Sequence, residues 1–164
     1  YTKPVYFLKT ATTGYLDHFS PVFLFSKGDQ IGRHSQVDMG QIFAFEAILL
    51  LISVFAVKNK WGGPLKIFIL WIFIAPIPAI IVSPTPHAYR TLQMAIPFAV
   101  FSGLGAHYLF LKKNFLLLKI ILVLTIGYSV FSFAHLTFSH YPKKFGADWQ
   151  DGYKQMVEKI TKYQ

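Results

Sequence analysis

The stretch SPTPHAYRTLQMAIPF, residues 83–98, stands between two long apolar runs of the chain. Pro84 and Pro86 disrupt helical hydrogen bonding, so we expect them to end the helix that precedes them. His87 to Arg90 then begin the next helix, and the positive end of its dipole meets two basic side chains there. The stretch predicts a turn between two helices and outlines an anion site. Alternatively, Arg90 reaches toward lipid headgroups and His87 caps the turn.

Four apolar blocks dominate the sequence, at residues 42–57, 65–82, 92–111 and 115–136. Each could span or nearly span a bilayer. A buried helix of a soluble protein is the alternative for any single block, but 164 residues could not supply enough polar surface to cover four of them. Because 54% of the residues are hydrophobic and only 14% are charged, the predicted fold is all-α, a polytopic transmembrane bundle of about four spans.

Lysines divide the connectors between these blocks into two kinds. VKNKWGGPLK (57–66) and LKKNFLLLK (111–119) carry six lysines and no acidic residue, which is typical of cytoplasmic loops. The turn at 83–91 would then lie on the external side. When only basic residues close to the spans are counted, the predicted cytoplasmic and external sides carry nearly equal numbers of them, so the charge bias is small.

The chain divides accordingly into three parts. Residues 1–41 are expected to form an external loop segment, 42–136 the transmembrane domain, and 137–164 an external tail. An even number of spans places both ends of the chain on the external side. The net charge of +9 fits a protein that lies against anionic lipid. A nucleic-acid partner would need a basic patch outside the membrane, and the sequence shows none.

The second block contains two further prolines. Pro76 and Pro78 each remove a helical hydrogen bond and should bend or interrupt the second span. Freed backbone is tolerated in a membrane where it faces protein or a cavity. The pattern fits either a cavity near the external face or a simple packing kink.

The first segment contains side chains that could bind a metal ion. Their spacing matches no recognised ligand pattern, so turn and surface roles are favoured. We assign no metal site from the sequence, although a divalent metal ion is a possible cofactor. The side chains concerned are Asp17, His18, Asp29, His34 and Asp38.

The tail predicts one amphipathic helix. In DWQDGYKQMVEKITKY (148–163), Asp148 is a candidate N-cap. This helix either lies on the bilayer or begins a soluble external domain that continues beyond Gln164. Its apolar face is formed at helical spacing by Trp149, Tyr153, Met156, Ile160 and Tyr163.

Three stretches resemble one family of membrane enzymes. PHAYRTLQMAIPF (86–98) is similar to the signature of GT-C fold integral-membrane glycosyltransferases, in which an external loop ends in His-x-x-Arg and a proline follows in the next helix. HFSPVFLFSKGDQIGRHS (18–35) and YPKKFGADWQDGYKQMVEKI (141–160) resemble the bacterial protein O-mannosyltransferase and aminoarabinose transferase group, which is dolichyl-phosphate-mannose-protein mannosyltransferase-like and falls in glycosyltransferase families 39 and 83.

The resemblance implies transfer of a sugar from a polyprenyl-phosphate donor to an acceptor protein, lipid or glycan at the external face of a bacterial plasma membrane. Arg90, helped by His87, would bind the donor phosphate, because a guanidinium fork matches phosphate oxygens and stays charged. Asp29, His34 and Glu46 would contact the acceptor or support the loops. For Glu46 the alternative is a hydrated carboxylate at the interface.

The sequence departs from the family in one respect. The acidic motif that such enzymes carry in their first external loop has no counterpart in residues 1–41. We therefore expect the catalytic base to lie in a preceding part of a longer protein, and this fragment alone to be inactive.

Two other functions remain open at this point. In a transporter or flippase subunit, the proline-broken span and the interfacial cations would form a substrate gate. The spans hold only Glu46 as an acid at membrane depth, and no repeat relates the two hairpins, which argues against that function. A non-catalytic membrane scaffold is the third class, and its loops would be dispensable.

Overall fold

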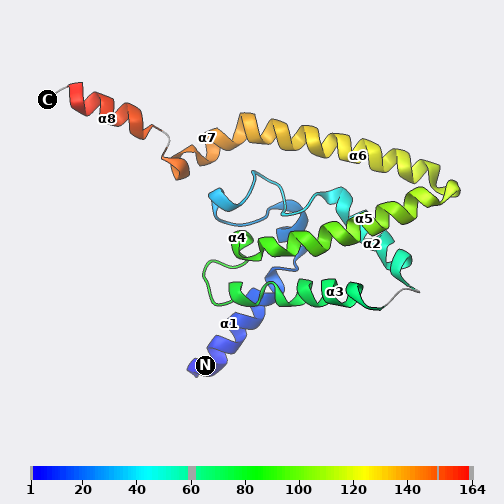
Figure 1. Cartoon of the computed structure of the whole chain (residues 1–164). Helices are drawn as coiled ribbons and strands as arrows, with labels where there is room; N and C mark the ends of the chain where they lie inside the picture. The colour runs from blue at the N-terminus through cyan, green and yellow to red at the C-terminus, as the bar shows by residue number, and fades with distance from the viewer. Residues whose placement is uncertain (1, 59–61, 151, 163–164) are drawn as a thin grey trace.

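The computed structural model of the chain describes residues 2–58, 62–150 and 152–162 (Figure 1). Regular structure within these ranges is helical, and no strand occurs among them. The expectation of an all-α fold is confirmed. Lys60 and Tyr163, which the sequence placed in a cytoplasmic connector and on the tail helix, lie outside the described residues.

The four apolar blocks form four helices. These are α2 (Ala44–Val57), α3 (Pro64–Ile74), α5 (Ala95–Leu111) and α6 (Leu116–His135). Pro64 stands at the start of α3, where a missing N–H breaks no intrahelical bond. Helices α2, α5 and α6 begin and end close to the predicted boundaries, whereas α3 ends at Ile74, well before the predicted end at residue 82.

Two helical stretches are long and apolar enough to cross a membrane, Ala88–Leu111 and Lys113–Trp149. The other two apolar helices, Ala44–Val57 and Pro64–Ala79, are shorter. The 14 residues of α2 extend about 21 Å at 1.5 Å per residue, against a hydrocarbon core of about 30 Å. Length and composition thus identify two candidate spans.

Pro76 and Pro78 interrupt the second apolar block as the sequence predicted, but Pro84 and Pro86 do not end its helix, because α3 already ends at Ile74. After α3, Pro76 and Pro78 lie in and beside the short 3-10 helix η3 (Ile77–Ala79). Pro84 and Pro86 follow, and helix α4 (Ala88–Thr91) begins directly after His87. A 3-10 turn, η4 (Leu92–Met94), then joins α4 to α5.

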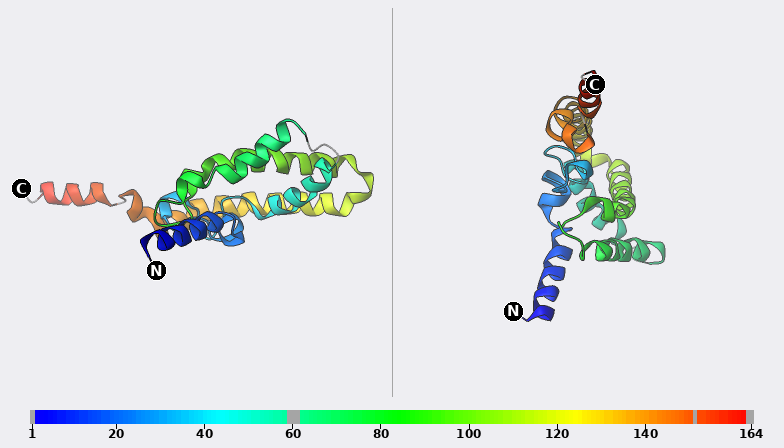
Figure 2. Two further views of the ribbon diagram at one scale, coloured as in Figure 1. Left: turned by 90° about the horizontal axis from the view of Figure 1, so that it is seen from below. Right: turned by 90° about the vertical axis from the view of Figure 1, so that its left-hand side faces the viewer.

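The connectors lie at opposite ends of the bundle. Figure 1 shows the end of α2, the start of α3 and the turn between α5 and α6 at one end, while the turn before α4, the start of α1 and the end of α8 lie toward the other. The view from below in Figure 2 shows the same arrangement. The main packing joins α2 to α5, whereas the consecutive pairs, α2 with α3 and α5 with α6, make little contact, so the two hairpins expected from the sequence do not pack as pairs.

A glycine allows α5 to pack closely on α2. A Cβ atom at Gly105 would lie 2.0 Å from the backbone oxygen of Leu49, whereas a Cβ at Gly103 would meet nothing within 4 Å. Buried leucines surround this contact and join α2 and α5 to α6. They are Leu49, Leu109 and Leu122.

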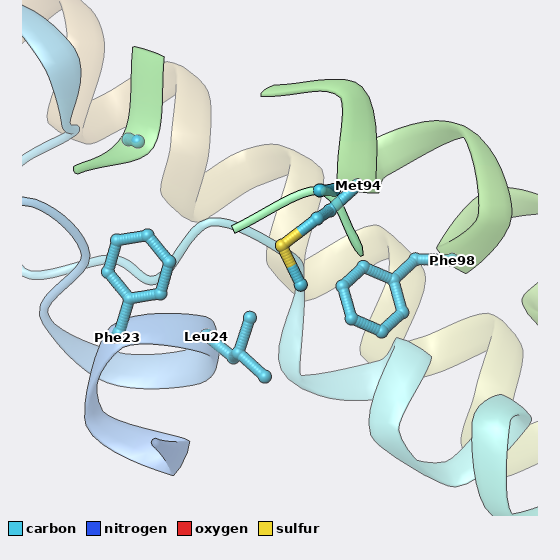
Figure 3. Close-up of a cluster of buried hydrophobic side chains, with 6 residues drawn as sticks. Phe23, Leu24, Met94 and Phe98 are labelled. Carbon is cyan, nitrogen blue, oxygen red and sulfur yellow. The ribbon is translucent and has the colours of Figure 1, made fainter. Parts of the chain in front are cut away.

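A second buried cluster attaches the first segment to the start of α5. Figure 3 shows Phe23 and Leu24, from the π-helical turn η1 (Val22–Ser26), beside Met94 and Phe98. Ala75 and Ala88 complete the cluster. This packing brings a segment far away in the sequence to the turn before α4.

Two further features differ from the sequence predictions. Helix α1 (Lys3–Asp17) occupies part of the segment expected to be a loop, because its threonines and lysines leave no strong apolar periodicity to read. Figure 1 shows α1 crossing the direction of α5 and α6 at a steep angle.

The second difference concerns the tail helix, whose predicted N-cap at Asp148 is wrong. Helical structure continues from α6 through η6 (Leu136–His140), α7 (Tyr141–Phe145) and η7 (Gly146–Trp149), so Asp148 lies in the preceding helical stretch. Gln150 and Gly152 then adopt positive φ angles of 60° and 85°. The last helix, α8, begins only after this break and covers Tyr153–Lys162.

The contact at Gly105 gives a stability prediction. Gly105→Ala should lower the free energy of unfolding by about 1–3 kcal/mol, because the new methyl group meets backbone that cannot rotate away. Gly103→Ala, two residues along the same helix, should cause no loss. Thermal unfolding of both variants in detergent measures the difference, and equal stability of the two would contradict this packing.

Candidate functional site

The candidate site lies at the turn before α4, where Asp29 binds the start of that helix. The Asp29 side chain is fully buried. Its Oδ1 accepts the N–H of Ile31 at 2.8 Å, and its Oδ2 accepts the N–H of Ala88 at 2.7 Å. The first N–H groups of a helix have no intrahelical partner, and a carboxylate is favoured at that end of the dipole. Asp29 therefore caps α4 from a distant part of the chain.

His18 caps the neighbouring N–H group. The residue follows α1 and is fully buried. Its Nδ1 lies 2.7 Å from the backbone oxygen of Gly14, and its Nε2 lies 3.0 Å from the N–H of His87. Because Nε2 accepts a hydrogen bond, Nδ1 must carry the proton and donate to Gly14. The contacts thus select one neutral tautomer of His18.

Burial supports the same protonation state. It lowers the pKa of His18, since a charged imidazolium would lose its hydration. The backbone oxygen of Gly14 and the carboxylates of Asp17 and Asp29 act in the opposite direction but are smaller effects. His18 is therefore expected to be neutral at physiological pH.

His34 and His87 bring two imidazoles to the buried carboxylate. The Nδ1 atoms of His34 and His87 lie 3.4 Å and 3.9 Å from Asp29 Oδ2. The two rings are tilted against each other with centroids 4.9 Å apart, and the ring of Tyr89 stacks with that of His34. Both Nδ1 atoms are buried without a hydrogen-bond partner in the described part of the chain.

The three ligating atoms are close enough to share one metal ion. One ligand atom each from Asp29, His34 and His87 lies within 4.8 Å of the other two. Asp17, His18 and Asp38, which the sequence grouped with them, do not belong to this set. The histidine that completes the set comes from the turn before α4, so the spacing within the first segment could not identify it.

The structure places the other predicted site residues differently. Arg90 is exposed on α4, and its guanidinium makes no ion pair with a carboxylate of the described residues. Glu46 instead stabilises the start of its own helix, because its Oε2 accepts the N–H of Phe43 at 3.0 Å. Asp29, His34 and His87 thus form the site together, Arg90 lies beside it, and Glu46 is used locally.

A third segment covers the loop that carries His34. The hydroxyl of Tyr141 donates to the backbone oxygen of Gly32 at 3.0 Å, and Trp149 Nε1 donates to that hydroxyl at 2.9 Å. A Cβ at Gly32 would collide with Phe145 and Asp148. The helical stretch after α6 therefore packs directly on the site loop.

Comparisons with known proteins leave the family open. No protein-family model, curated protein or solved structure matches the chain. A functional assignment therefore depends on the residues and contacts described above.

The capping role of His18 predicts a pH-dependent stability. Since its pKa is lowered in the folded protein, the unfolded chain binds a proton first as the pH falls below about 6.5. The contribution of His18 to the free energy of unfolding should thus be constant above this pH. Below it, stability should fall by up to about 1.4 kcal/mol per pH unit from this residue.

Denaturant unfolding between pH 5 and pH 8, a range that includes the ordinary histidine pKa of about 6.5, measures this slope. His18→Gln should flatten it, while His140→Gln, at an exposed histidine, should leave it as in the unsubstituted protein. An unchanged slope in His18→Gln would show that His18 is not the titrating cap.

Proposed function

We propose that this chain is part of a membrane glycosyltransferase that moves a sugar from a polyprenyl-phosphate donor to an acceptor at the external membrane face. One observation carries the proposal. The three stretches that resemble such enzymes are far apart in the sequence, but 18–35 contacts 86–98 at the turn before α4 and contacts 141–160 at Gly32. Residues of all three stretches thus surround one site.

Arg90 is the residue best placed for the donor phosphate. The N–H groups of His87 and Ala88 already bind His18 and Asp29, so the helix start offers fewer free donors than the sequence alone suggested. Arg90 is an exposed residue in the first turn of that helix. A planar fork of donors fits phosphate oxygens and gains strength as the leaving phosphate becomes more negative.

A groove along α6 suits the lipid part of such a donor. It has a volume of about 450 Å³ and lies between residues 38–44 and α6. Apolar side chains form most of its wall, among them Phe25, Ile42, Phe43, Phe131 and Leu136. An isoprenoid chain would bury its apolar surface there.

We also propose four membrane crossings, with α2 and α3 in addition to the two long candidate spans. The end of α2, the start of α3 and the turn between α5 and α6 lie at one end of the bundle (Figure 1), and the lysines in and beside these elements favour a cytoplasmic location for that end. Large apolar side chains on α3 and α6 are exposed, as a lipid-facing surface requires, including Ile67, Leu70, Leu117, Leu124 and Phe131. Both described ends would then lie outside the cell.

The phosphate assignment predicts a loss of activity in Arg90→Ala. In the full-length protein, turnover should fall about 30- to 1000-fold, which corresponds to a loss of about 2–4 kcal/mol of transition-state stabilisation. Arg90→Lys should recover only part, because the fork is lost. Arg33→Ala, an exposed arginine on the neighbouring loop, serves as the control and should retain activity.

Transfer of labelled sugar from a polyprenyl-phosphate donor in native membranes measures these rates. Normal turnover and donor affinity in Arg90→Ala would show that Arg90 only reaches toward lipid headgroups. A protein that transports the intact lipid-linked sugar without cleaving it would instead be a flippase.

The four-crossing arrangement predicts which side of the membrane each loop faces. The chain contains no cysteine, so single cysteines can be introduced without background labelling. An impermeant thiol reagent added from outside should label Tyr89→Cys and Trp149→Cys, and should label Lys58→Cys and Lys113→Cys only after permeabilisation. Labelling of all four from outside would contradict the arrangement.

A further inference from the structure

We propose that Asp29, His34 and His87 bind one divalent transition-metal ion, with zinc as the ion that fits these ligands best. The inference goes beyond the transferase proposal and does not depend on it. It rests on the positions, burial and unpaired atoms of the three side chains.

The spacing of the ligand atoms suits a tetrahedral ion. Asp29 Oδ2 lies 3.4 Å from His34 Nδ1 and 3.9 Å from His87 Nδ1, and the three ligand atoms all lie within 4.8 Å of one another. With metal–ligand bonds of about 2.0–2.1 Å, neighbouring ligands of a tetrahedral ion lie about 3.3 Å apart. Small inward movements of the two imidazoles would therefore complete the coordination.

The unpaired nitrogens give a second and independent observation. The Nδ1 atoms of His34 and His87 are buried and have no hydrogen-bond partner among the described residues. A buried polar atom without a partner costs free energy. A metal ion that accepts both lone pairs removes that cost for both atoms at once.

Surrounding contacts hold the ligands in place. Two backbone N–H groups, those of Ile31 and Ala88, fix the Asp29 carboxylate. His34 lies in the short 3-10 helix η2 (Gly32–His34), and its ring stacks with Tyr89 and makes a tilted contact with the ring of His87. Hydrogen bonds and packing contacts to the ligand side chains orient them and raise the affinity for the metal.

The ligand types determine which ion is expected. Two imidazoles and one carboxylate suit zinc and its transition-metal neighbours, whereas magnesium and calcium prefer oxygen ligands. Three protein ligands leave a fourth position open. The His34 side chain is 25% exposed, so an ion and a small oxygen ligand can reach that position from outside.

A protonated His34 paired with Asp29 is the competing interpretation. Charge-assisted hydrogen bonds of this kind are usually about 2.7–2.9 Å long, and the two histidines lie farther from the carboxylate, at 3.4 and 3.9 Å. An ion pair with His34 would also leave Nδ1 of His87 without a partner. Binding of one metal ion satisfies both nitrogens.

Titration of the purified full chain with zinc chloride in detergent tests the proposal, after chelator treatment and removal of the chelator. We expect one zinc ion per chain by calorimetry and by elemental analysis, together with a raised unfolding temperature. Magnesium chloride at the same concentration should give neither. His34→Gln should weaken zinc binding at least about tenfold, while His140→Ala, which removes a histidine of the exposed His135–His140 pair, should bind as the unsubstituted chain does.

A spectroscopic measurement on the unsubstituted chain avoids any dependence on variant folding. Cobalt chloride should produce the intense visible absorption bands of a tetrahedral site, and zinc should abolish them. Absence of these bands, equal zinc affinity in His34→Gln and the unsubstituted chain, or loss of zinc only in His140→Ala would each overturn the proposal.

Discussion

Asp29 and His18 accept the N–H groups of Ala88 and His87, and these two hydrogen bonds determine how the rest of the site is arranged. Without them the first donors of α4 would be buried and unpaired, since a helix cannot satisfy them internally. Both acceptors come from the first segment of the chain. If that segment moved away from the turn, the N–H groups of His87 and Ala88 would lose their hydrogen-bond acceptors.

Apolar packing supports the same contact from the side. Phe23 and Leu24 pack on Met94 and Phe98 next to the two hydrogen bonds. On the opposite side, Tyr141 holds the loop at Gly32. The site is consequently built from three separate parts of the chain, each of which is fixed by a hydrogen bond and by contacts of its own.

The sequence was sufficient to predict the four apolar helices, but it did not predict α1 or how the elements contact one another. Apolar blocks of sufficient length identified α2, α3, α5 and α6, and Pro84 with Pro86 identified the turn, because both signals are local. The contact between Asp29 and Ala88 spans 59 positions and leaves no local pattern. The search for a metal-ligand spacing pattern missed the cluster for the same reason, since His87 lies far from Asp29 in the sequence. The break at Gln150 depends on a left-handed backbone angle that a glutamine rarely adopts.

Hydrogen exchange at the amides of residues 87 and 88 tests the central claim most directly. Both groups are buried and paired with side chains of the first segment, so they should exchange far more slowly than the amides of an open turn. In Asp29→Ala the amide of Ala88 should lose most of this protection while the middle of α5 keeps its own. Rapid exchange at both amides in the unsubstituted chain would show that the first segment does not cap α4.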